Sequence, residues 1–326
     1  MSHAETSETS EPSETSAASA TSATSATSAT SATDKTSETS ETDETDTASA
    51  APAGEPFDLD AYLARIGLRG ERRAGIATLR EVHLAHALSV PFENLDALAG
   101  RAPSLAPADL VAKMVRGRRG GYCYEQNTLL ALALRALGFE VSGLAGRVVL
   151  GADDPESRPR THMMLRVAVP GESRPYLADV GFGATGALLE PVPLAVGPEF
   201  AGAGRRHRLV RLPHGGPLEL WALQAYDPGA ADWIAQYAFT QERFVATDFE
   251  VANWYVATHP RSPFTRRAYL QRTTAGRHVC LDGARFTETL ADGTVTGRTL
   301  TDEAEARRVA EGEFDIAVPE GLRLLG

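Results

Sequence analysis

The spacing of apolar residues changes along the chain from a period of three to four to a period of two. Three segments have the longer period, which predicts amphipathic helices over residues 57–68, 76–90 and 123–139. Pro91 ends the second helix and Gly138 ends the third, because proline cannot continue a helix and glycine favours its C-terminal cap. The pattern therefore predicts a helical region from about residue 57 to residue 138.

Beyond Gly138, apolar and polar residues alternate in short runs that Gly, Pro and Asp separate, which is typical of strands and turns. A meander of strands is predicted over 277–300, and a short amphipathic helix over 302–314. Helices first, then antiparallel strands, then a mixed region indicate an α+β fold rather than a doubly wound parallel sheet. The other predicted strands cover residues 140–150, 161–169, 174–183, 206–212 and 218–226.

Residues 1–55 differ in composition from the rest of the chain. They repeat Ser-Ala-Thr triplets between acidic residues and hold eleven Asp or Glu against one Lys. Such a segment has too few apolar residues to offset the entropy of ordering, so we predict a disordered tail. The remaining residues hold 32 acidic and 31 basic side chains. This near balance gives no electrostatic footprint for nucleic acid or for a membrane surface.

The low cysteine count also limits the possible protein classes. Two cysteines in 326 residues exclude a disulfide scaffold, and the N-terminus has neither the basic nor the apolar region of a secretory signal. We therefore expect a soluble, cytoplasmic protein. His83 and His86, three residues apart on a predicted helix, could form half of a metal site. No cluster of further ligands completes that site, so we expect ordinary packing and no metal.

The stretch "RGGYCYEQN" places Cys123 at the start of the third predicted helix. The unpaired N–H groups of a first helical turn favour thiolate over thiol, and the two preceding glycines permit a sharp approach to the helix. The alternative is a buried cysteine that acts as a small hydrophobic residue, as we expect for Cys280. A nucleophilic thiol also requires a base and a group that orients the base.

"THMMLRVAVPGESRPYLADVGFG" supplies both groups. We read this stretch as a hairpin whose turn is centred between Pro170 and Gly171, which places His162 opposite Asp179. Directly opposed side chains on one face of a hairpin lie about 5 Å apart at Cβ. Cys123, His162 and Asp179 thus form a candidate triad in which the carboxylate orients the imidazole and the imidazole deprotonates the thiol.

With these motifs, the chain resembles the arylamine N-acetyltransferases. "RGGYCYEQN" resembles the family's nucleophile motif, "THMMLRV" its histidine strand, "DVGFG" its aspartate turn and "VPFENLD" a fourth signature. The resemblance covers nearly all of residues 56–326 and assigns the triad to Cys123, His162 and Asp179. It implies a cysteine-protease-like core in three parts. These are a helical bundle over 56–140, an antiparallel β-barrel over 141–245, and an α/β lid over 246–326.

The resemblance also implies a substrate pair. Acetyl-CoA would donate an acetyl group, through an acetyl-cysteine intermediate, to a small aromatic amine or hydrazine. The residues implied beside acetyl-CoA are Thr161, Phe182 and Gly183. The residues implied in the flat apolar slot for the amine are Phe92 and Phe264.

Two other activities share the Cys-His-Asp order. An amide synthase of similar fold would release a polyketide chain from a carrier protein as a macrolactam. A transglutaminase-like or papain-like thiol hydrolase is the second, although "PFENL" and "DVGFG" argue against it.

"GFGATG" matches a dinucleotide fingerprint, but the prolines that follow exclude the helix it requires. Glu93, Arg119 and Glu125 are interpreted as a partly buried ion pair that supports the nucleophile loop.

Overall fold

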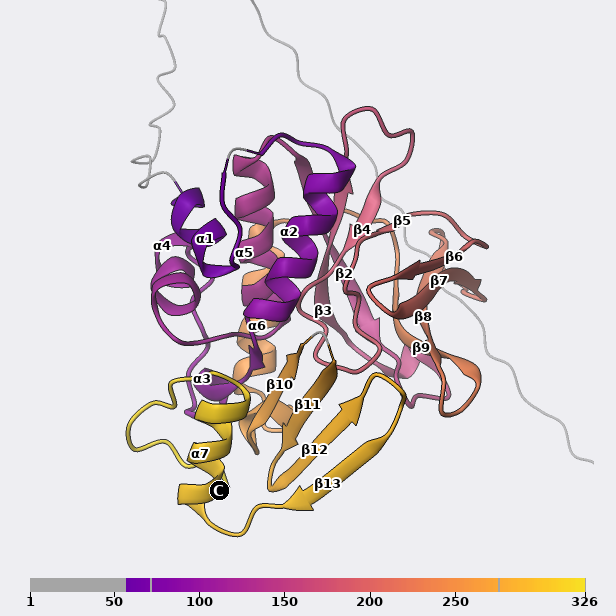
Figure 1. The fold of residues 1–326 in the computed structure, drawn as a ribbon. Helices are drawn as coiled ribbons and strands as arrows, with labels where there is room; N and C mark the ends of the chain where they lie inside the picture. The colour runs from indigo at the N-terminus through magenta and orange to yellow at the C-terminus, as the bar shows by residue number, and fades with distance from the viewer. Residues whose placement is uncertain (1–56, 71, 275, 326) are drawn as a thin grey trace, which may run out of the picture. The chain divides into compact units, whose positions relative to one another are not determined.

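The helices near the N-terminus agree with the apolar spacing (Figure 1). The computed structural model describes residues 57–325 except Glu71 and Ala275, so the predicted disordered tail lies outside the described residues. The three predicted helices are present as α1 (Leu59–Arg65), α2 (Ile76–Ser89) and α5 (Cys123–Ala136).

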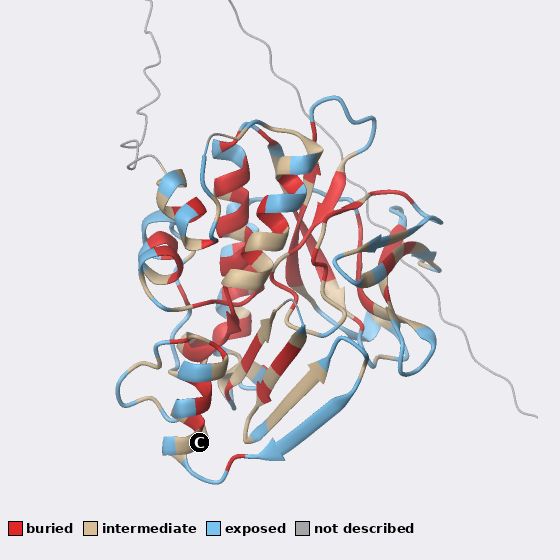
Figure 2. Ribbon diagram, viewed as in Figure 1, coloured by how far each residue is buried: buried red, intermediate tan, exposed pale blue. Residues whose placement is uncertain are grey.

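Short elements connect α2 to α5. Strand β1 (Phe92–Glu93), helix α3 (Leu95–Leu98), helix α4 (Pro107–Leu110) and a π-helix (Val111–Arg116) follow α2 in that order. Helix α5 is buried along most of its length, as the red ribbon of Figure 2 shows. Its first turn, Cys123–Asn127, is buried at every position. Polar side chains in this turn therefore require partners inside the protein.

The middle of the chain forms an eight-stranded antiparallel sheet in the order β5-β4-β3-β2-β9-β8-β7-β6. An isolated bridge joins Val196, just beyond β5, to Leu209 of β7, so the sheet is nearly closed. Leu144, Leu223 and Tyr237 are among the side chains packed inside it. The strands are β2 (Glu140–Val148), β3 (Arg160–Ala168), β4 (Tyr176–Ala178), β5 (Val192–Pro193), β6 (Glu199–Gly202), β7 (Arg205–Leu212), β8 (Leu220–Asp227) and β9 (Asp232–Phe239).

The C-terminal part combines a second antiparallel sheet with helices. The sheet order is β1-β10-β11-β12-β13, so a strand from residues 92–93 forms its first edge. Phe92 pairs with Gln271 in that edge. The predicted α+β fold is confirmed, while the divisions at residues 140 and 245 stay predictions. The elements are α6 (Ala246–Thr258), a 3₁₀ turn (Pro263–Thr265), β10 (Tyr269–Thr273), β11 (Arg277–Asp282), β12 (Arg285–Leu290), β13 (Val295–Thr299) and α7 (Glu303–Glu313).

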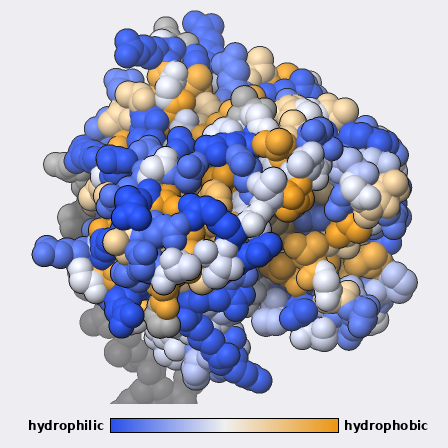
Figure 3. All heavy atoms as spheres, turned by 60° about the horizontal axis from the view of Figure 1, so that its bottom comes forward, coloured by the Kyte–Doolittle hydropathy of each residue, from blue (hydrophilic) through white to orange (hydrophobic). Residues whose placement is uncertain are grey.

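Hydrophilic residues predominate on the face shown in Figure 3, and apolar residues form smaller groups among them. Two large exposed apolar side chains, Val251 and Trp254, both belong to α6. Within the described part of the chain, no helix combines the length and the apolar character needed to cross a bilayer.

Candidate active site

Cys123 is the first residue of α5, where the sequence predicted a helix start. Its side chain is 5% exposed, and its Sγ lies 3.8 Å from the carbonyl oxygen of Thr161 on β3. The approach to the helix requires glycine, because a Cβ on Gly120 would overlap the carbonyl oxygen of Pro91. Glu125 accepts the N–H of Tyr122 at 3.2 Å and caps the first turn. The thiol is thus held at a fixed helix terminus beside β3.

The structure brings His162 and Asp179 together, although the predicted hairpin register is wrong. The observed pairs, including Leu165 with Ala178, shift the register by two residues from the prediction. The turn between β3 and β4 is longer than a two-residue turn and includes Gly171 at φ +83°. Because β4 ends at Ala178, Asp179 leaves the ladder and its Oδ2 lies 2.7 Å from His162 Nε2.

Burial and the neighbouring charges shift the pKa values of His162 and Asp179 in opposite directions. Burial alone would lower the pKa of His162, but the charge of Asp179, their hydrogen bond and the neighbouring Cys123 thiol raise it to about 10. Burial would raise the pKa of Asp179, yet His162, Asn127 and the N–H of Gly181 lower it. Both pKa shifts favour an imidazolium on His162 paired with a carboxylate on Asp179. A cation beside a thiol favours the thiolate.

Asn127, whose role the sequence pattern did not reveal, fixes Asp179 from the end of the first turn of α5. Its Nδ2 donates to Asp179 Oδ1 at 2.9 Å and to the carbonyl oxygen of Met163 at 2.8 Å. Its Oδ1 accepts the N–H of Val180 at 3.1 Å. One amide therefore joins α5, β3 and the segment that carries Asp179.

This arrangement agrees with the comparisons with known proteins. A family model described as N-acetyltransferase matches residues 75–323. An arylamine N-acetyltransferase of Mycolicibacterium smegmatis is 46% identical over 209 residues, which cover 64% of this chain and 73% of the relative. The chain belongs to the arylamine N-acetyltransferase family.

Solved structures of the family have the same fold. The arylamine N-acetyltransferase of Nocardia farcinica superposes with a TM-score of 0.75 at 43% identity, covering 82% of this chain and 95% of that one. The Mycobacterium marinum enzyme, solved in complex with CoA, gives a TM-score of 0.73 at 34% identity, covering 79% and 93%. The resemblance found in the motifs is confirmed, and the chain is a transferase.

The residues that the family resemblance implied for ligands lie beside His162 or pack on one another. Thr161 directly precedes His162 on β3, and Phe182 lies edge-on to the His162 ring at a centroid distance of 5.2 Å. Gly183 faces the ring of Phe92, where a Cβ would lie 2.9 Å from the ring carbons. Phe264 packs on Phe92 at a centroid distance of 5.9 Å. Their roles in binding stay predictions.

A cluster of five charged side chains supports the loop before Cys123. The interpreted pair of Glu93 and Arg119 is present, with 2.7 Å between Arg119 Nε and Glu93 Oε1. Lys113, on the π-helix, lies 2.6 Å from Glu125 and 2.5 Å from Asp96, and it was missed because its partners are distant in sequence. Burial raises the pKa of Glu125 to about 7 despite Lys113, so this carboxylate depends on the lysine for its charge.

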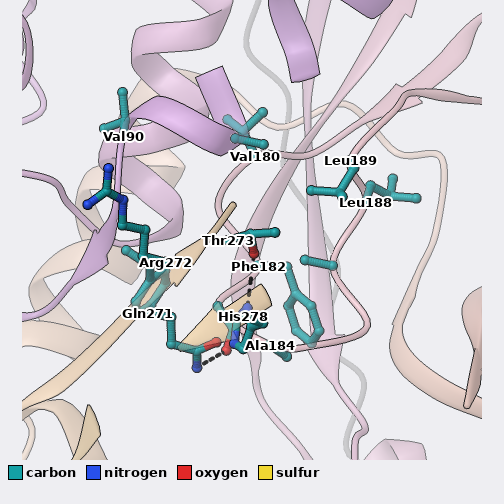
Figure 4. Close-up of a pocket in the computed structure, with 14 residues that line it drawn as sticks. Val90, Val180, Phe182, Ala184, Leu188, Leu189, Gln271, Arg272, Thr273 and His278 are labelled. Atoms are coloured by element: carbon teal, nitrogen blue, oxygen red, sulfur yellow. Dashed lines mark hydrogen bonds between the residues drawn. The ribbon is translucent and has the colours of Figure 1, made fainter. Parts of the chain in front are cut away.

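A small cavity lies beside the segment that follows Asp179 (Figure 4). Its volume of about 30 Å³ has room for one or two water molecules. Val180, Phe182 and Leu189 line it from one part of the chain. Gln271 and His278 line it from β10 and β11. The Nε2 of Gln271 donates to the carbonyl oxygen of Gly183, which ties this segment to the C-terminal sheet.

The histidines on α2 have hydrogen-bond partners within the protein. His86 Nε2 lies 2.7 Å from Gln126 Oε1, and its Nδ1 lies 2.8 Å from the hydroxyl of Tyr62. Among the described residues, no group of three potential ligands could hold a metal ion.

Cys280 on β11 is half-buried, and burial raises the pKa of its thiol to about 11. "GFGATG" leads into β5 with no helix over the described residues 184–191.

Proposed function

We propose that the protein transfers an acetyl group from acetyl-CoA to an arylamine or arylhydrazine through an acetyl-cysteine intermediate. The observation that carries this proposal is the buried His162–Asp179 pair at 2.7 Å beside the Cys123 thiol at the start of α5. Membership of the family and the CoA complex of the Mycobacterium marinum relative support the choice of donor. A cytoplasmic location stays a prediction.

In the first half-reaction, the Cys123 thiolate attacks the thioester carbonyl and a new carbon–sulfur bond forms at Sγ. The bond to the sulfur of CoA breaks, and the imidazolium of His162 gives its proton to that sulfur. Because Asp179 holds Nε2, the proton passes through Nδ1 of the ring. Cys123 is then acetylated and His162 is neutral.

In the second half-reaction, the amine nitrogen attacks the acetyl carbonyl and the bond to Sγ breaks. His162 accepts the proton that the amine loses, so the thiolate and the imidazolium are both restored. The carboxylate of Asp179 keeps the ring oriented and stabilises its charged form in both halves. Phe92 and Phe264 supply apolar ring surface for the aromatic acceptor.

Intact-mass analysis with acetyl-CoA alone tests the proposal. We expect one acetyl adduct, located at Cys123, that disappears when an aromatic amine is added. Steady-state rates should follow the parallel lines of a ping-pong scheme. Cys123→Ser should lose both the adduct and turnover, while Cys280→Ser should keep both. Acetyl transfer by Cys123→Ser, or an adduct at Cys280, would show that the mechanism is wrong.

A further inference from the structure

His83 on α2 joins both ends of the segment that carries Asp179. This segment, residues 179–189, is here called the Asp179 loop. The Nε2 of His83 accepts the backbone N–H of Asp179 at 3.0 Å, and its Nδ1 lies 3.1 Å from the carbonyl oxygen of Leu189. The side chain is fully buried.

These two contacts fix the tautomer of His83. A backbone N–H is only a donor and a carbonyl oxygen is only an acceptor, so Nε2 must be unprotonated and Nδ1 must carry the hydrogen. Burial lowers the pKa of His83 to about 4, although the Asp179 charge acts against this effect. The ring therefore stays neutral at the pH at which the triad operates, and the imidazolium form could not accept the Asp179 N–H.

Backbone position determines where the Asp179 carboxylate lies. The N–H of Asp179 belongs to the same residue as the carboxylate that holds His162 at 2.7 Å. Without Nε2, this N–H would be buried and unpaired, and such groups are rare because they cost as much as a lost hydrogen bond. The Asp179 loop would then shift to find another acceptor. A shift of about 1 Å in a reacting group can lower a rate about a hundredfold.

We infer that His83 is a positioning residue for the proposed acyl transfer: its Nε2 holds the Asp179 backbone and, through it, the orientation of His162. This inference rests on the proposed function. His83 does not reach the reacting atoms, because its two ring nitrogens are occupied by the Asp179 loop. Its effect on the reaction passes through the Asp179 loop.

Two amide variants separate the two contacts of His83. Glutamine reaches as far as Nε2, so the carbonyl oxygen of His83→Gln can accept the Asp179 N–H. Asparagine reaches only as far as Nδ1, so His83→Asn can bond to Leu189 but not to Asp179. Both variants place a neutral polar amide in the same buried site, and each serves as the control for the other.

The main measurement is the pH dependence of Cys123 alkylation by iodoacetamide, followed by mass spectrometry of the Cys123 peptide. A weaker His162–Asp179 bond makes the imidazolium less stable and the thiolate harder to form. In His83→Asn the rise in alkylation should move by about one unit to higher pH, about the net worth of one hydrogen bond. Its kcat should fall about ten- to a hundredfold with little change in the KM for the amine.

His83→Gln should keep the wild-type profile and a kcat within about threefold of wild type. A purely structural role would lower the melting temperature of both variants and leave both alkylation profiles at the wild-type position, which would overturn the inference. If wild type fails to transfer acetyl groups while His83→Asn still shifts the profile, the proposed function fails and the role of His83 stands. If wild type transfers acetyl groups and the two variants behave alike, the role of His83 fails by itself.

A further measurement does not depend on whether His83→Asn folds. Nitrogen-15 NMR of the wild-type histidine rings should show His83 at neutral pH with hydrogen on Nδ1 and none on Nε2. The signal is assigned by its absence from His83→Gln. A ring protonated on Nε2, or on both nitrogens, would rule out the contact with Asp179 and overturn the inference.

Discussion

The substitution Gly181→Ala tests how closely the Asp179 loop packs against helix α5. A Cβ at this position would lie 2.6 Å from Cys123 Cα and 2.8 Å from Asn127 Nδ2. The nearest atom belongs to the backbone of a buried helix, so it cannot rotate away as a flexible side chain would. Gly181 also donates its N–H to Asp179 Oδ1 at 2.9 Å, which couples any movement of this residue to the carboxylate.

The expected effect of Gly181→Ala follows from these distances. An ordinary contact begins near 3.4 Å, so the loop and the helix must separate by about 0.8 Å. Overpacking of this kind costs about 1–3 kcal/mol of unfolding free energy. Because a displacement near 1 Å can cost about a hundredfold in rate, we expect kcat/KM to fall about ten- to a hundredfold.

Thermal unfolding measures the loss of stability in Gly181→Ala. Alkylation of Cys123 reports the displacement of the Asp179 loop from this residue. The melting temperature should fall by about 2–4 °C for each kcal/mol lost. Gly312→Ala is the matched control, since Gly312 lies on α7 with open space where the added Cβ would lie. That change should leave activity unchanged and stabilise the helix by up to about 1 kcal/mol. Wild-type melting and alkylation in Gly181→Ala would refute the close packing of the loop on Cys123.

Three further predictions concern charged groups. Asp179→Asn should lower kcat by about four orders of magnitude, as neutralising the acid does in other triads, and activity within about threefold of wild type would contradict its role. Lys113→Met removes the partly buried cation that contacts Glu93, Asp96 and Glu125, while Arg119 keeps its pairs with Glu93 and Asp96, and should cost about 3–5 kcal/mol in chemical unfolding. Arg118→Met, which breaks only the exposed pair with Asp315, should cost less than about 1 kcal/mol. The raised pKa of His162 stabilises the fold below pH 6.5, and this contribution is lost as pH rises to about 10. The difference in melting temperature between wild type and His162→Gln should therefore shrink over that range, and a growing difference would contradict the assignment.

Elements whose ends have strong local sequence signals were predicted well. Helix α5 begins at Cys123 because two glycines and a capping glutamate surround its first turn. The predicted register of β3 on β4 was wrong because the length of the turn, and not the apolar alternation, determines which residues face each other. His162 and Asp179 still meet, because Asp179 lies beyond the end of β4 and is free to turn toward β3.

Contacts between distant parts of the chain could not be predicted from spacing. Asn127 bonds to Asp179 over 52 positions, and His83 bonds to the same residue over 96. The sequence marked His83 only as half of a possible metal site and Asn127 only as the end of the cysteine motif. Lys113 was missed for the same reason, since its carboxylate partners lie on other elements. Such partners become visible only when the fold places the elements together.

The pairing of β1 with β10 has a consequence for the order in which the site forms during synthesis. Phe92 and Glu93 bridge the loop before Cys123 on one side and pair with Gln271 and Leu270 on the other. Strand β10 is translated about 180 residues after β1, which takes on the order of ten to forty seconds at ordinary elongation rates. Until then the edge of β1 has no ladder partner from β10. Cys123, the proposed nucleophile, is therefore made early and reaches its final surroundings only when most of the polypeptide has been translated.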